Sequence, residues 1–171
     1  MNQASYRIAL VTLSDRAAAG SRADESGQVL RELLEQHGLP VFAQLVLPDD
    51  AGQLVDRLIH LAEVEHADLI LTTGGTGLSR RDVTPEATLA VIDQRVLGIE
   101  EAMRAAGLRQ TPYAMLSRAV AGVRGRTLII NLPGSPKGVR ENLAVVLPVL
   151  PHALALLREE QVQDEQHFFQ P

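Results

Sequence analysis

Apolar residues in the first half of the chain form short runs that alternate with longer stretches patterned at helical spacing. The continuous run at residues 8–11 is typical of a strand buried on both faces of a parallel sheet, and the runs at 41–47 and 69–71 predict a second and a third strand. Two amphipathic helices are predicted between them, from positions three and four residues apart: Val29, Leu30, Leu33 and Leu34, then Leu54, Val55, Leu58, Ile59 and Ala62. This alternation predicts a parallel sheet with right-handed crossovers and helices on both faces.

Glycine, proline and capping residues mark where these elements begin and end. Gly38 predicts the end of the first helix, and Pro48 ends the second strand. Thr84, Pro85 and Glu86 predict the start of a third helix, since they supply a capping hydroxyl, a proline at the first helical position and an acid in the first turn. The first half is therefore expected to form three successive strand–helix units.

The pattern of the second half predicts one more helix and a hairpin. Residues 99–106 have helical spacing, and that helix is expected to stop near Gly107. Segments 119–123 and 127–131 flank the turn Arg-Gly-Arg, which predicts a hairpin and therefore a mixed sheet. We expect an α/β fold, a three-layer α/β/α arrangement with a mostly parallel sheet and a C-terminal hairpin contribution.

The last helical region sets the expected end of the folded domain. Residues 139–158 are predicted to be helical and bent where Pro148 and Pro151 remove backbone donors. A chain of 171 residues, 46% of them apolar, fits one globular domain. We therefore expect a single domain over residues 1–158 and a polar, frayed tail over 159–171.

The composition excludes several classes of protein. The 16 Lys and Arg against 21 Asp and Glu give a formal net charge of −5, which disfavours a nucleic-acid binder because neutralising a phosphate backbone needs a basic face. Three Phe, two Tyr and no Trp offer no platform for stacking bases. The absence of Cys excludes disulfides, Cys-zinc sites and thiol nucleophiles together.

Neither a leader nor a membrane span is expected. The N-terminus lacks the charged-then-apolar layout of a signal peptide. The most apolar long stretch, residues 144–157, is interrupted by Pro148, Pro151 and His152 and is too short to cross a bilayer. We therefore expect a cytoplasmic protein with neither nucleic acid nor a membrane as its partner.

Two glycine-rich segments follow strands of the predicted sheet. Residues 72–77 (Thr-Thr-Gly-Gly-Thr-Gly) and 131–138 (Asn-Leu-Pro-Gly-Ser-Pro-Lys-Gly) hold five of the thirteen Gly, where even scatter gives about one. Glycine lets main-chain N–H groups approach a ligand closely, and each segment leads towards a helix start, which favours phosphate. Neither segment matches the dinucleotide fingerprint or the P-loop. They predict a phosphate cradle of another kind, with two tight surface turns as the structural alternative.

Carboxylates follow the same strands. Asp15 follows the first strand, Asp49 and Asp50 follow the second, and Asp82 follows the third. In open α/β sheets ligands bind at the carboxyl ends of the strands, so these acids are expected to converge with the glycine segments. Mg²⁺ would resolve the repulsion between carboxylates and phosphates, since it binds one or two carboxylates and shares phosphate oxygens. The alternative for each Asp is a turn or helix cap; for Asp82 we favour a functional role.

Basic and hydroxyl side chains near these segments are further candidates. Lys137 and the pair Arg80 and Arg81 are candidate phosphate partners, although a solvated surface role is open for one of the two Arg. Ser135 is expected to cap the last helix, with Pro136 at its first position, rather than to bind a ligand. It lacks the Gly-x-Ser-x-Gly surroundings of a serine hydrolase nucleophile.

Five motifs together resemble those of the MoaB/Mog family of molybdenum cofactor biosynthesis proteins: Ser14-Asp15-Arg16, Pro48-Asp49, residues 72–77, residues 81–88 (Arg-Asp-Val-Thr-Pro-Glu-Ala-Thr) and residues 131–138. The resemblance extends from about residue 7 to residue 157. It implies a three-layer α/β/α domain that assembles as a homotrimer, or sometimes as a hexamer. It also implies molybdopterin adenylyltransfer, in which Mg²⁺-ATP and molybdopterin give adenylylated molybdopterin and pyrophosphate.

The same resemblance assigns site residues by position. Asp49 and Asp82 match the acids regarded as catalytic and are the expected Mg²⁺ ligands. The residues that match the nucleotide and phosphate side are Ser14, Asp15, Thr73, Gly74, Gly75, Thr76 and Gly77. The residues that match the molybdopterin side are Asn131, Pro133, Gly134, Ser135, Lys137 and Ser117.

Two other functions stay open. Segment 131–138 runs directly into the last helical region, without the insertion of some Mog-type members, so the chain is closer in outline to the MoaB branch. One alternative is therefore a non-catalytic carrier that binds molybdopterin without adenylylating it. The other is a nucleotide hydrolase built on the same loops. The resemblance includes no fused molybdenum-insertase domain, so the insertion step is expected to need a separate protein.

Overall fold

A computed structural model of the chain describes residues 6–159, which form one mixed six-stranded sheet. The strands are β1 (Ile8–Leu13), β2 (Val41–Leu47), β3 (Leu69–Thr73), β4 (Gln94–Arg95), β5 (Ala121–Arg124) and β6 (Thr127–Leu132). They lie in the order β2-β1-β3-β6-β5-β4, and the strands β2, β1, β3 and β6 run parallel to one another. β5 is antiparallel to β6 and β4 is antiparallel to β5, so the predicted hairpin and mixed sheet are confirmed.

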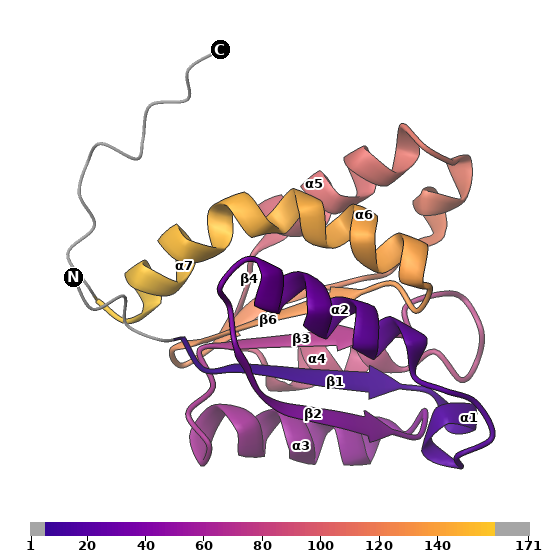
Figure 1. Cartoon of the computed structure of the whole chain (residues 1–171), viewed down its shortest axis with the longest axis horizontal. Helices are drawn as coiled ribbons and strands as arrows, with labels where there is room; N and C mark the ends of the chain where they lie inside the picture. Colours follow the sequence, from indigo (N-terminus) through magenta and orange to yellow (C-terminus); the bar gives the residue numbers. More distant parts are fainter. Residues whose placement is uncertain (1–5, 160–171) are drawn as a thin grey trace.

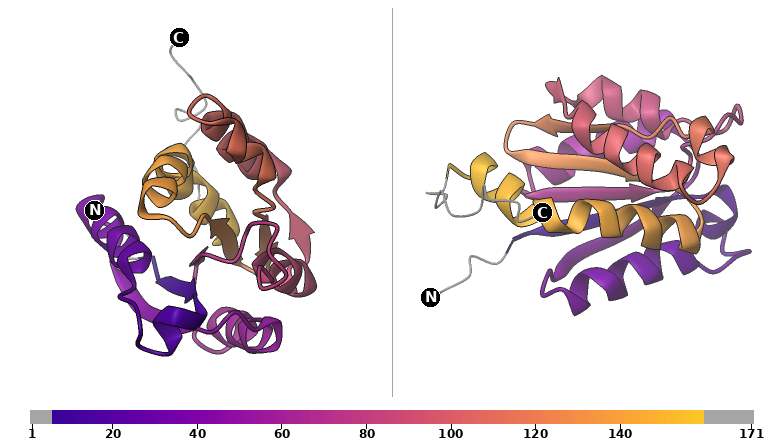
Figure 2. Two further views of the ribbon diagram at one scale, coloured as in Figure 1. Left: turned by 90° about the vertical axis from the view of Figure 1, so that its right-hand side faces the viewer. Right: turned by 90° about the horizontal axis from the view of Figure 1, so that it is seen from above.

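Helices cover both faces of this sheet, as predicted (Figures 1 and 2). The helices are α1 (Asp15–Ala18), α2 (Glu25–Gln36), α3 (Ala51–Glu63), α4 (Thr84–Val91), α5 (Leu97–Leu108), α6 (Pro136–Val146) and α7 (Leu150–Leu157), with the 3₁₀ turns η1 (Pro112–Leu116) and η2 (Leu147–Val149). Helices α2, α5, α6 and α7 lie on one face, and α3 and α4 lie on the other. The three-layer α/β/α prediction is confirmed.

The central strand β1 shows why its sequence is a continuous apolar run. Ile8 and Leu10 pack against α2 and the C-terminal helices, whereas Ala9 and Val11 pack against α3 and α4. Alternate side chains of a strand point to opposite faces, so a strand covered on both faces is apolar at every position. Because β2, β1, β3 and β6 run parallel, their carboxyl ends meet at one edge of the sheet.

The prediction missed the edge strand β4, whose two residues are both exposed and polar. This edge is fixed by Glu100, which is only 1% exposed. The Glu100 carboxylate accepts two hydrogen bonds from Arg95 at 3.1 and 2.7 Å, one from Arg104 at 3.4 Å and one from the main-chain N–H of Ala121 at 3.1 Å. A buried carboxylate therefore joins α5 to β4 and β5.

The C-terminal helical region is bent at η2, as the prolines predicted, and α6 and α7 follow one another along the same face. Taken as one helical stretch, Pro136–Leu157 is 22 residues with a mean hydropathy of 1.3, which by length and composition suffices to cross a membrane. The apolar stretch that the sequence analysis considered, residues 144–157, is part of this longer helical region, which also includes α6. The buried residues of the whole region, Val139, Leu143, Val146, Leu150 and Leu154, pack in the core beneath one face of the helices, which is the pattern of a covering helix in an α/β layer.

The predicted polar tail over residues 159–171 falls outside the described residues except for Glu159.

Candidate functional site

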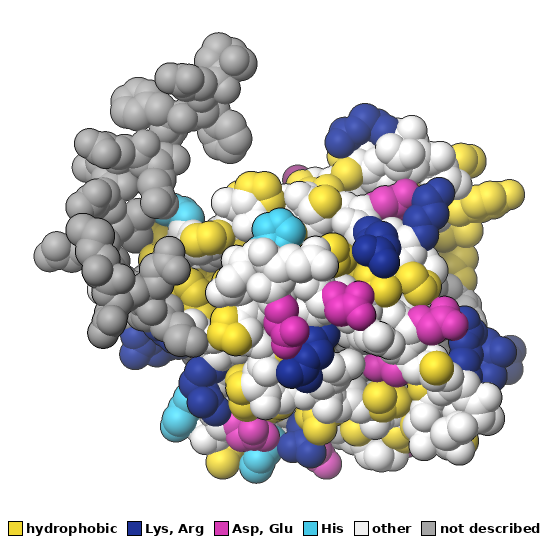
Figure 3. Space-filling view, viewed as in Figure 1, with side chains coloured by type: hydrophobic (Ala, Val, Ile, Leu, Met, Phe, Trp, Pro, Cys, Tyr) yellow, Lys and Arg dark blue, Asp and Glu magenta, His cyan; other side chains and the backbone are white. Residues whose placement is uncertain are grey.

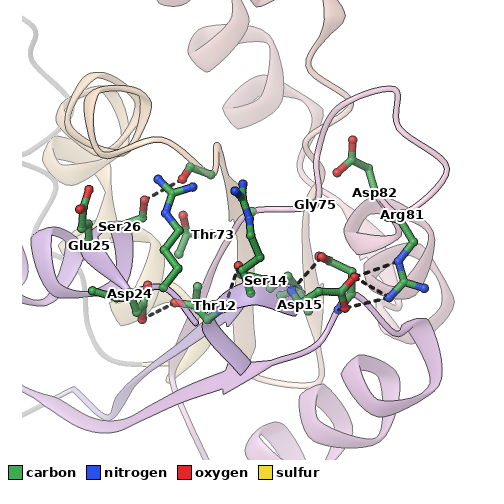
Figure 4. A pocket seen from close by; sticks show the side chains of 18 of the residues that line it. Thr12, Ser14, Asp15, Asp24, Glu25, Ser26, Thr73, Gly75, Arg81 and Asp82 are labelled. Atoms are coloured by element: carbon green, nitrogen blue, oxygen red, sulfur yellow. Dashed lines mark hydrogen bonds and ion pairs between the residues drawn. The ribbon is translucent and has the colours of Figure 1, made fainter. Parts of the chain in front are cut away.

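A cleft of about 430 Å³ opens at the carboxyl ends of β1, β2 and β3, where the sequence predicted the site (Figure 4). Its walls are formed by Thr12, Leu13, Ser14, Asp15, Arg16, Ala17, Arg22, Ala23, Asp24, Glu25, Ser26, Asp49, Thr73, Gly74, Gly75, Ser79, Arg81, Asp82 and Gly134. Asp24 and Ser26 lie at one end and Arg81 and Asp82 at the other, with Gly75 between them. The predicted acids Asp15, Asp49 and Asp82 thus meet the first glycine segment in one cleft.

The backbone conformation at positions 74 and 75 can be adopted only by glycine. Their φ angles are +97° and +65°, a region that side chains rarely adopt. A Cβ on Gly74 would lie 2.3 Å from the Leu13 carbonyl oxygen, and one on Gly75 would lie 2.4 Å from Thr84 Oγ1. The loop can therefore pass this close to β1 and α4 only without side chains.

Thr84 holds this loop instead of capping its own helix. Thr84 Oγ1 donates to the Gly74 carbonyl at 2.8 Å, and the Thr84 N–H donates to the Gly75 carbonyl at 3.1 Å. Helix α4 begins after Val83 with no side-chain cap. The predicted capping role of the Thr84 hydroxyl is wrong, because a loop carbonyl ten residues earlier in the chain takes its proton.

The two glycine-rich segments touch each other beside the cleft. A Cβ on Gly134 would lie 3.1 Å from Gly74 Cα, so the two main chains are in contact. Thr73 Oγ1 donates to the Pro133 carbonyl at 2.7 Å, and Ser26 Oγ donates to the Gly134 carbonyl at 2.7 Å. The hydroxyls of Thr73 and Ser26 thus fix the second segment against the first.

Asp15 and Asp49 form a reciprocal pair at the ends of β1 and β2. The Asp49 N–H donates to Asp15 Oδ1 at 2.9 Å, and the Asp15 N–H donates to Asp49 Oδ2 at 3.1 Å. Arg81 adds two-pronged contacts to Asp15, from Nε at 3.0 Å and from Nη2 at 2.7 and 2.8 Å (Figure 4). The Asp49 N–H and the Arg81 guanidinium hold the pKa of Asp15 below its usual value.

Asp82 and Asp50 have different positions: one lines the cleft and the other caps a helix. Asp82 lines the cleft, and its Oδ2 accepts the Ser79 N–H at 2.9 Å, which orients the carboxylate. Asp50 does not line the cleft; its Oδ1 accepts the Gln53 N–H at 2.9 Å and caps α3. For Asp50, therefore, the structure shows the capping alternative.

Of the predicted cations Lys137, Arg80 and Arg81, only Arg81 lines the cleft, and two further cations join it there. Arg81 is engaged by Asp15, and Lys137 lies outside the cleft, 79% exposed and 3.7 Å from Glu141. Arg16 and Arg22 line the cleft instead, and within residues 6–159 neither forms an ion pair. Sequence patterning could not single out Arg22, because it lies in an irregular segment before α2 and belongs to none of the five motifs.

Of the residues matched to the molybdopterin side, only Gly134 lines the cleft. Asn131 is fully buried: its Nδ2 donates to Thr72 Oγ1 and Thr88 Oγ1, both at 2.9 Å, and its Oδ1 accepts the Val120 N–H at 3.1 Å. With its side chain committed in this way, Asn131 joins β6 to β3 and α4 and does not line the cleft, and its contact with molybdopterin stays a prediction.

The other residues of that group lie around the second segment and η1. Ser135 Oγ accepts the Gly138 N–H at 3.0 Å, so the expected cap of α6 is confirmed. The Pro133 carbonyl is engaged by Thr73, as described above. Ser117 lies after η1, where its Oγ accepts the Ala119 N–H at 3.3 Å.

Thr76 and Gly77 turn away from the cleft towards Arg118, a residue that belongs to none of the five motifs. The Arg118 N–H donates to the Thr76 carbonyl at 3.0 Å, and Arg118 Nε donates to the Gly77 carbonyl at 2.7 Å. These contacts join positions about 40 residues apart in the chain, so a local pattern could not reveal them.

The carboxylates of the cleft suit a metal ion that is bound jointly by the protein and by the phosphates of a substrate, and not one bound by protein ligands alone. Among residues 6–159 no group of three or more His, Asp or Glu could hold a metal ion. Asp15 is occupied by Arg81, whereas Asp49 Oδ1 and Asp82 Oδ1 accept no hydrogen bond within the described residues. Mg²⁺ is typically bound through one or two carboxylates plus substrate phosphates, and this donor set suits that arrangement.

Comparison with known proteins identifies the family. Residues 9–152 match a family model described as "Probable molybdopterin binding domain", so the match includes every residue that lines the cleft. The chain belongs to the MoaB/Mog family. The resemblance noted from its motifs is thus confirmed.

Relatives of this MoaB/Mog protein carry three different names. The molybdopterin adenylyltransferase of Helicobacter pylori is 40% identical over 158 residues, which cover 91% of this chain and 90% of that protein. The molybdopterin biosynthesis enzyme MoaB from Thermus thermophilus has 51% sequence identity to this chain. Its crystal structure matches with a TM-score of 0.86, and the match covers 92% of this chain and 99% of the MoaB chain. Gephyrin of Dictyostelium discoideum is 41% identical over 165 residues, but this chain spans only 23% of its length.

Proposed function

We propose that this MoaB/Mog protein is a molybdopterin adenylyltransferase that transfers AMP from ATP to molybdopterin and releases pyrophosphate. The observation that carries the proposal is the meeting of Asp49, Asp82 and the Gly74–Gly75 backbone in one cleft. The name of the Helicobacter pylori relative supports it, since that protein is matched over nearly its whole length. ATP and molybdopterin are the proposed substrates.

In the proposed reaction the terminal phosphate of molybdopterin attacks the α-phosphorus of ATP. A new P–O bond forms to the α-phosphorus, the bond from the α-phosphorus to the bridging oxygen breaks, and pyrophosphate leaves in line. No covalent enzyme intermediate is needed, because positioning and charge neutralisation are sufficient in transfers of this class.

The cleft residues divide this task between them. Main-chain groups of the first glycine segment are proposed to face phosphate oxygens, since the segment comes close to β1 and carries no side chains at Gly74 and Gly75. Asp49 and Asp82 would hold Mg²⁺, which, when bound, neutralises charge on the phosphates. Arg16 and Arg22 are the cleft cations without an acidic partner in residues 6–159, and we assign them to substrate phosphate.

The acidic balance of the cleft favours the metal assignment. Its walls carry five carboxylates, from Asp15, Asp24, Glu25, Asp49 and Asp82, against three guanidinium groups, from Arg16, Arg22 and Arg81. A polyphosphate would be repelled by this excess of negative charge unless a cation accompanied it. ATP is therefore expected to bind as its Mg²⁺ complex.

Self-association is part of the proposal. Four apolar side chains on α5 and η1, here called the η1 patch, are exposed: Leu108, Tyr113, Met115 and Leu116. Tyr113 is 78% and Met115 68% exposed, and hydrophobic side chains project at this end of the molecule in Figure 3, at the upper right. Large exposed apolar groups that cluster in this way are typical of protein interfaces, and we propose that they contribute to a homotrimer or hexamer.

A pyrophosphate-release assay tests the function. With Mg²⁺-ATP, we expect release only when molybdopterin is present and loss of release when EDTA removes the metal. Binding of molybdopterin without release would instead identify a carrier, and release without molybdopterin would identify a nucleotide hydrolase. Sedimentation equilibrium of the wild type and of Met115→Glu tests the assembly; a monomeric wild type would contradict it.

A further inference from the structure

Arg118 binds a single loop at several points. This loop, residues 76–82, leaves the cleft after Gly75 and lines it again at Ser79, Arg81 and Asp82. Arg118 Nε donates to the Gly77 carbonyl at 2.7 Å and Nη2 donates to the Asp82 carbonyl at 2.8 Å, while the Arg118 N–H donates to the Thr76 carbonyl at 3.0 Å. The remaining nitrogen, Nη1, pairs with Glu86 on α4. One side chain thus fixes both ends of the loop.

Near Asp82 the loop is held by two guanidinium groups: that of Arg81, within the loop, pairs with Asp15, and that of Arg118 binds the loop's main chain from outside. Its own hydrogen bonds are a local turn, in which the Asp82 N–H donates to the Ser79 carbonyl at 2.9 Å and the Ser79 N–H donates to Asp82 Oδ2 at 2.9 Å. Leu78, Ser79 and Arg80 in its middle are exposed. The local turn sets the Asp82 carboxylate relative to Ser79, whereas Arg118 ties the main chain of Asp82 to the body of the protein.

Arg118 acts behind the cleft and not in it. It is absent from the residues that line the cleft, and its guanidinium is committed to two carbonyls and a carboxylate. Hydrogen bonds from a charged donor are shorter and stronger than neutral ones, and the planar guanidinium can reach carbonyls in different directions at once. A lysine could replace the charge but not this geometry.

We propose that Arg118 is a positioning residue for adenylyl transfer, holding the 76–82 loop so that Asp82 faces the cleft. The role assigned to Asp82 rests on the proposed function, whereas the attachment of the loop to Arg118 can be tested independently of it. Small displacements of a catalytic group can cost about 10²-fold in rate. Loss of Arg118 is therefore expected to lower kcat while KM for ATP changes little.

The chain offers a matched control six residues further on, at the end of β5. Arg124 ends β5, donates to the Val91 carbonyl at 2.6 Å and pairs with Glu63. It lies opposite Thr127, the first residue of β6, and therefore at the edge of the sheet away from the cleft. Arg118→Ala and Arg124→Ala therefore remove similar sets of contacts. Arg118→Lys serves as the conservative variant in case Arg118→Ala does not fold.

The experiment combines kinetics with hydrogen exchange. We expect Arg118→Ala to lose at least tenfold in kcat, Arg118→Lys to lose less, and Arg124→Ala to keep wild-type kcat. Millimolar guanidinium should restore part of the kcat of Arg118→Ala but none of that of Asp82→Asn, since only the former lacks a guanidinium. Amides of residues 76–82 should exchange faster in Arg118→Ala alone.

Three results would overturn the proposal: wild-type kcat in folded Arg118→Ala, an equal loss in Arg124→Ala, or unchanged exchange of the loop. Sedimentation of each variant shows whether a loss of activity follows from changed assembly, which would also count against it. If the wild type releases no pyrophosphate, the proposed function fails, and the exchange comparison still decides whether Arg118 holds the loop.

Discussion

The carboxylates of Asp15 and Asp49 each accept the main-chain N–H of the other residue, at 2.9 and 3.1 Å. This exchange joins the carboxyl ends of β1 and β2, and Arg81 neutralises Asp15 from the loop that follows β3. Asp49 is thereby held in the cleft with Oδ1 accepting no hydrogen bond within residues 6–159. Two neighbouring acids thus have separate tasks: Asp15 fixes the geometry, and Asp49 is available for chemistry.

The adjacent residues Asp49 and Asp50 provide a direct test of this division. Asp49→Asn should lower kcat by about 10²–10³, the usual cost of one preorganised charge stabiliser, and Asp82→Asn should do the same. Asp50→Asn should keep wild-type kcat, because Asn caps a helix about as well as Asp. Steady-state pyrophosphate release measures all three, and circular dichroism verifies folding. Equal losses in Asp49→Asn and Asp50→Asn would contradict the assignment.

Gly74 is expected to be indispensable to the loop. In Gly74→Ala, a positive φ is combined with a Cβ 2.3 Å from a main-chain oxygen, so β1 or the loop must move. Gly125→Ala is the control, since its φ is +55° with nothing within 4 Å of the added Cβ. We expect Gly125→Ala to cost about 1–3 kcal/mol from backbone strain alone and Gly74→Ala to cost more. Urea unfolding of both variants gives the comparison, and a smaller loss in Gly74→Ala would refute it.

The sequence predicted best what is encoded locally. The apolar runs predicted β1 and β3 because burial on both faces needs apolar residues at consecutive positions, whereas β2 was found from its length and apolar content although it is a half-exposed edge strand. Ser135 was identified as a cap because its partner, Gly138, is three residues away. The convergence of Asp15, Asp49 and Asp82 also followed from sequence, since parallel strands place their carboxyl ends at one edge.

The hydrophobic and motif patterns of the sequence could not predict contacts between segments that are far apart in the chain. Thr84 has the residue type and position of a helix cap, yet its hydroxyl bonds the Gly74 carbonyl. Arg118 and Arg81 are of the same residue type, and only the fold shows that one binds the 76–82 loop and the other binds Asp15. Side-chain partners of this kind depend on the tertiary arrangement, so chemical type alone could not assign them.

Arg16 and Arg22 should contribute to substrate binding more than to the chemical step. Both line the cleft, whereas the exposed Arg80 does not and serves as the control. A charged hydrogen bond is worth about 1.5–3 kcal/mol, so Arg16→Ala or Arg22→Ala should raise KM for ATP or molybdopterin by about tenfold or more. The effect should shrink at high ionic strength, because salt screens exposed charges. An equal rise of KM in Arg80→Ala would indicate a nonspecific charge effect.

Glu100 should control the stability of the β4 edge in a pH-dependent manner. Burial acts to raise the pKa of Glu100, but the hydrogen bonds from Arg95 and the Ala121 N–H, together with the Arg95 charge, bring it below the usual value. A depressed pKa means that the folded state binds the proton less tightly than the unfolded state. The stabilisation is therefore present above the unfolded pKa of about 4.3 and is lost as pH falls through the folded value.

Glu100→Gln removes the charge and keeps the size of the side chain. Because Arg95 and Arg104 are partly exposed and water can solvate them, we expect a loss of about 1.5–3 kcal/mol at pH 7, the value of a charge-assisted hydrogen bond. The difference in unfolding free energy between wild type and Glu100→Gln should stay constant from pH 7 to 5 and shrink below about pH 4. Glu101→Gln, at the exposed neighbouring position, should change little at any pH. A difference that grows as the pH falls would show that Glu100 is protonated in the native protein, contrary to its bonding.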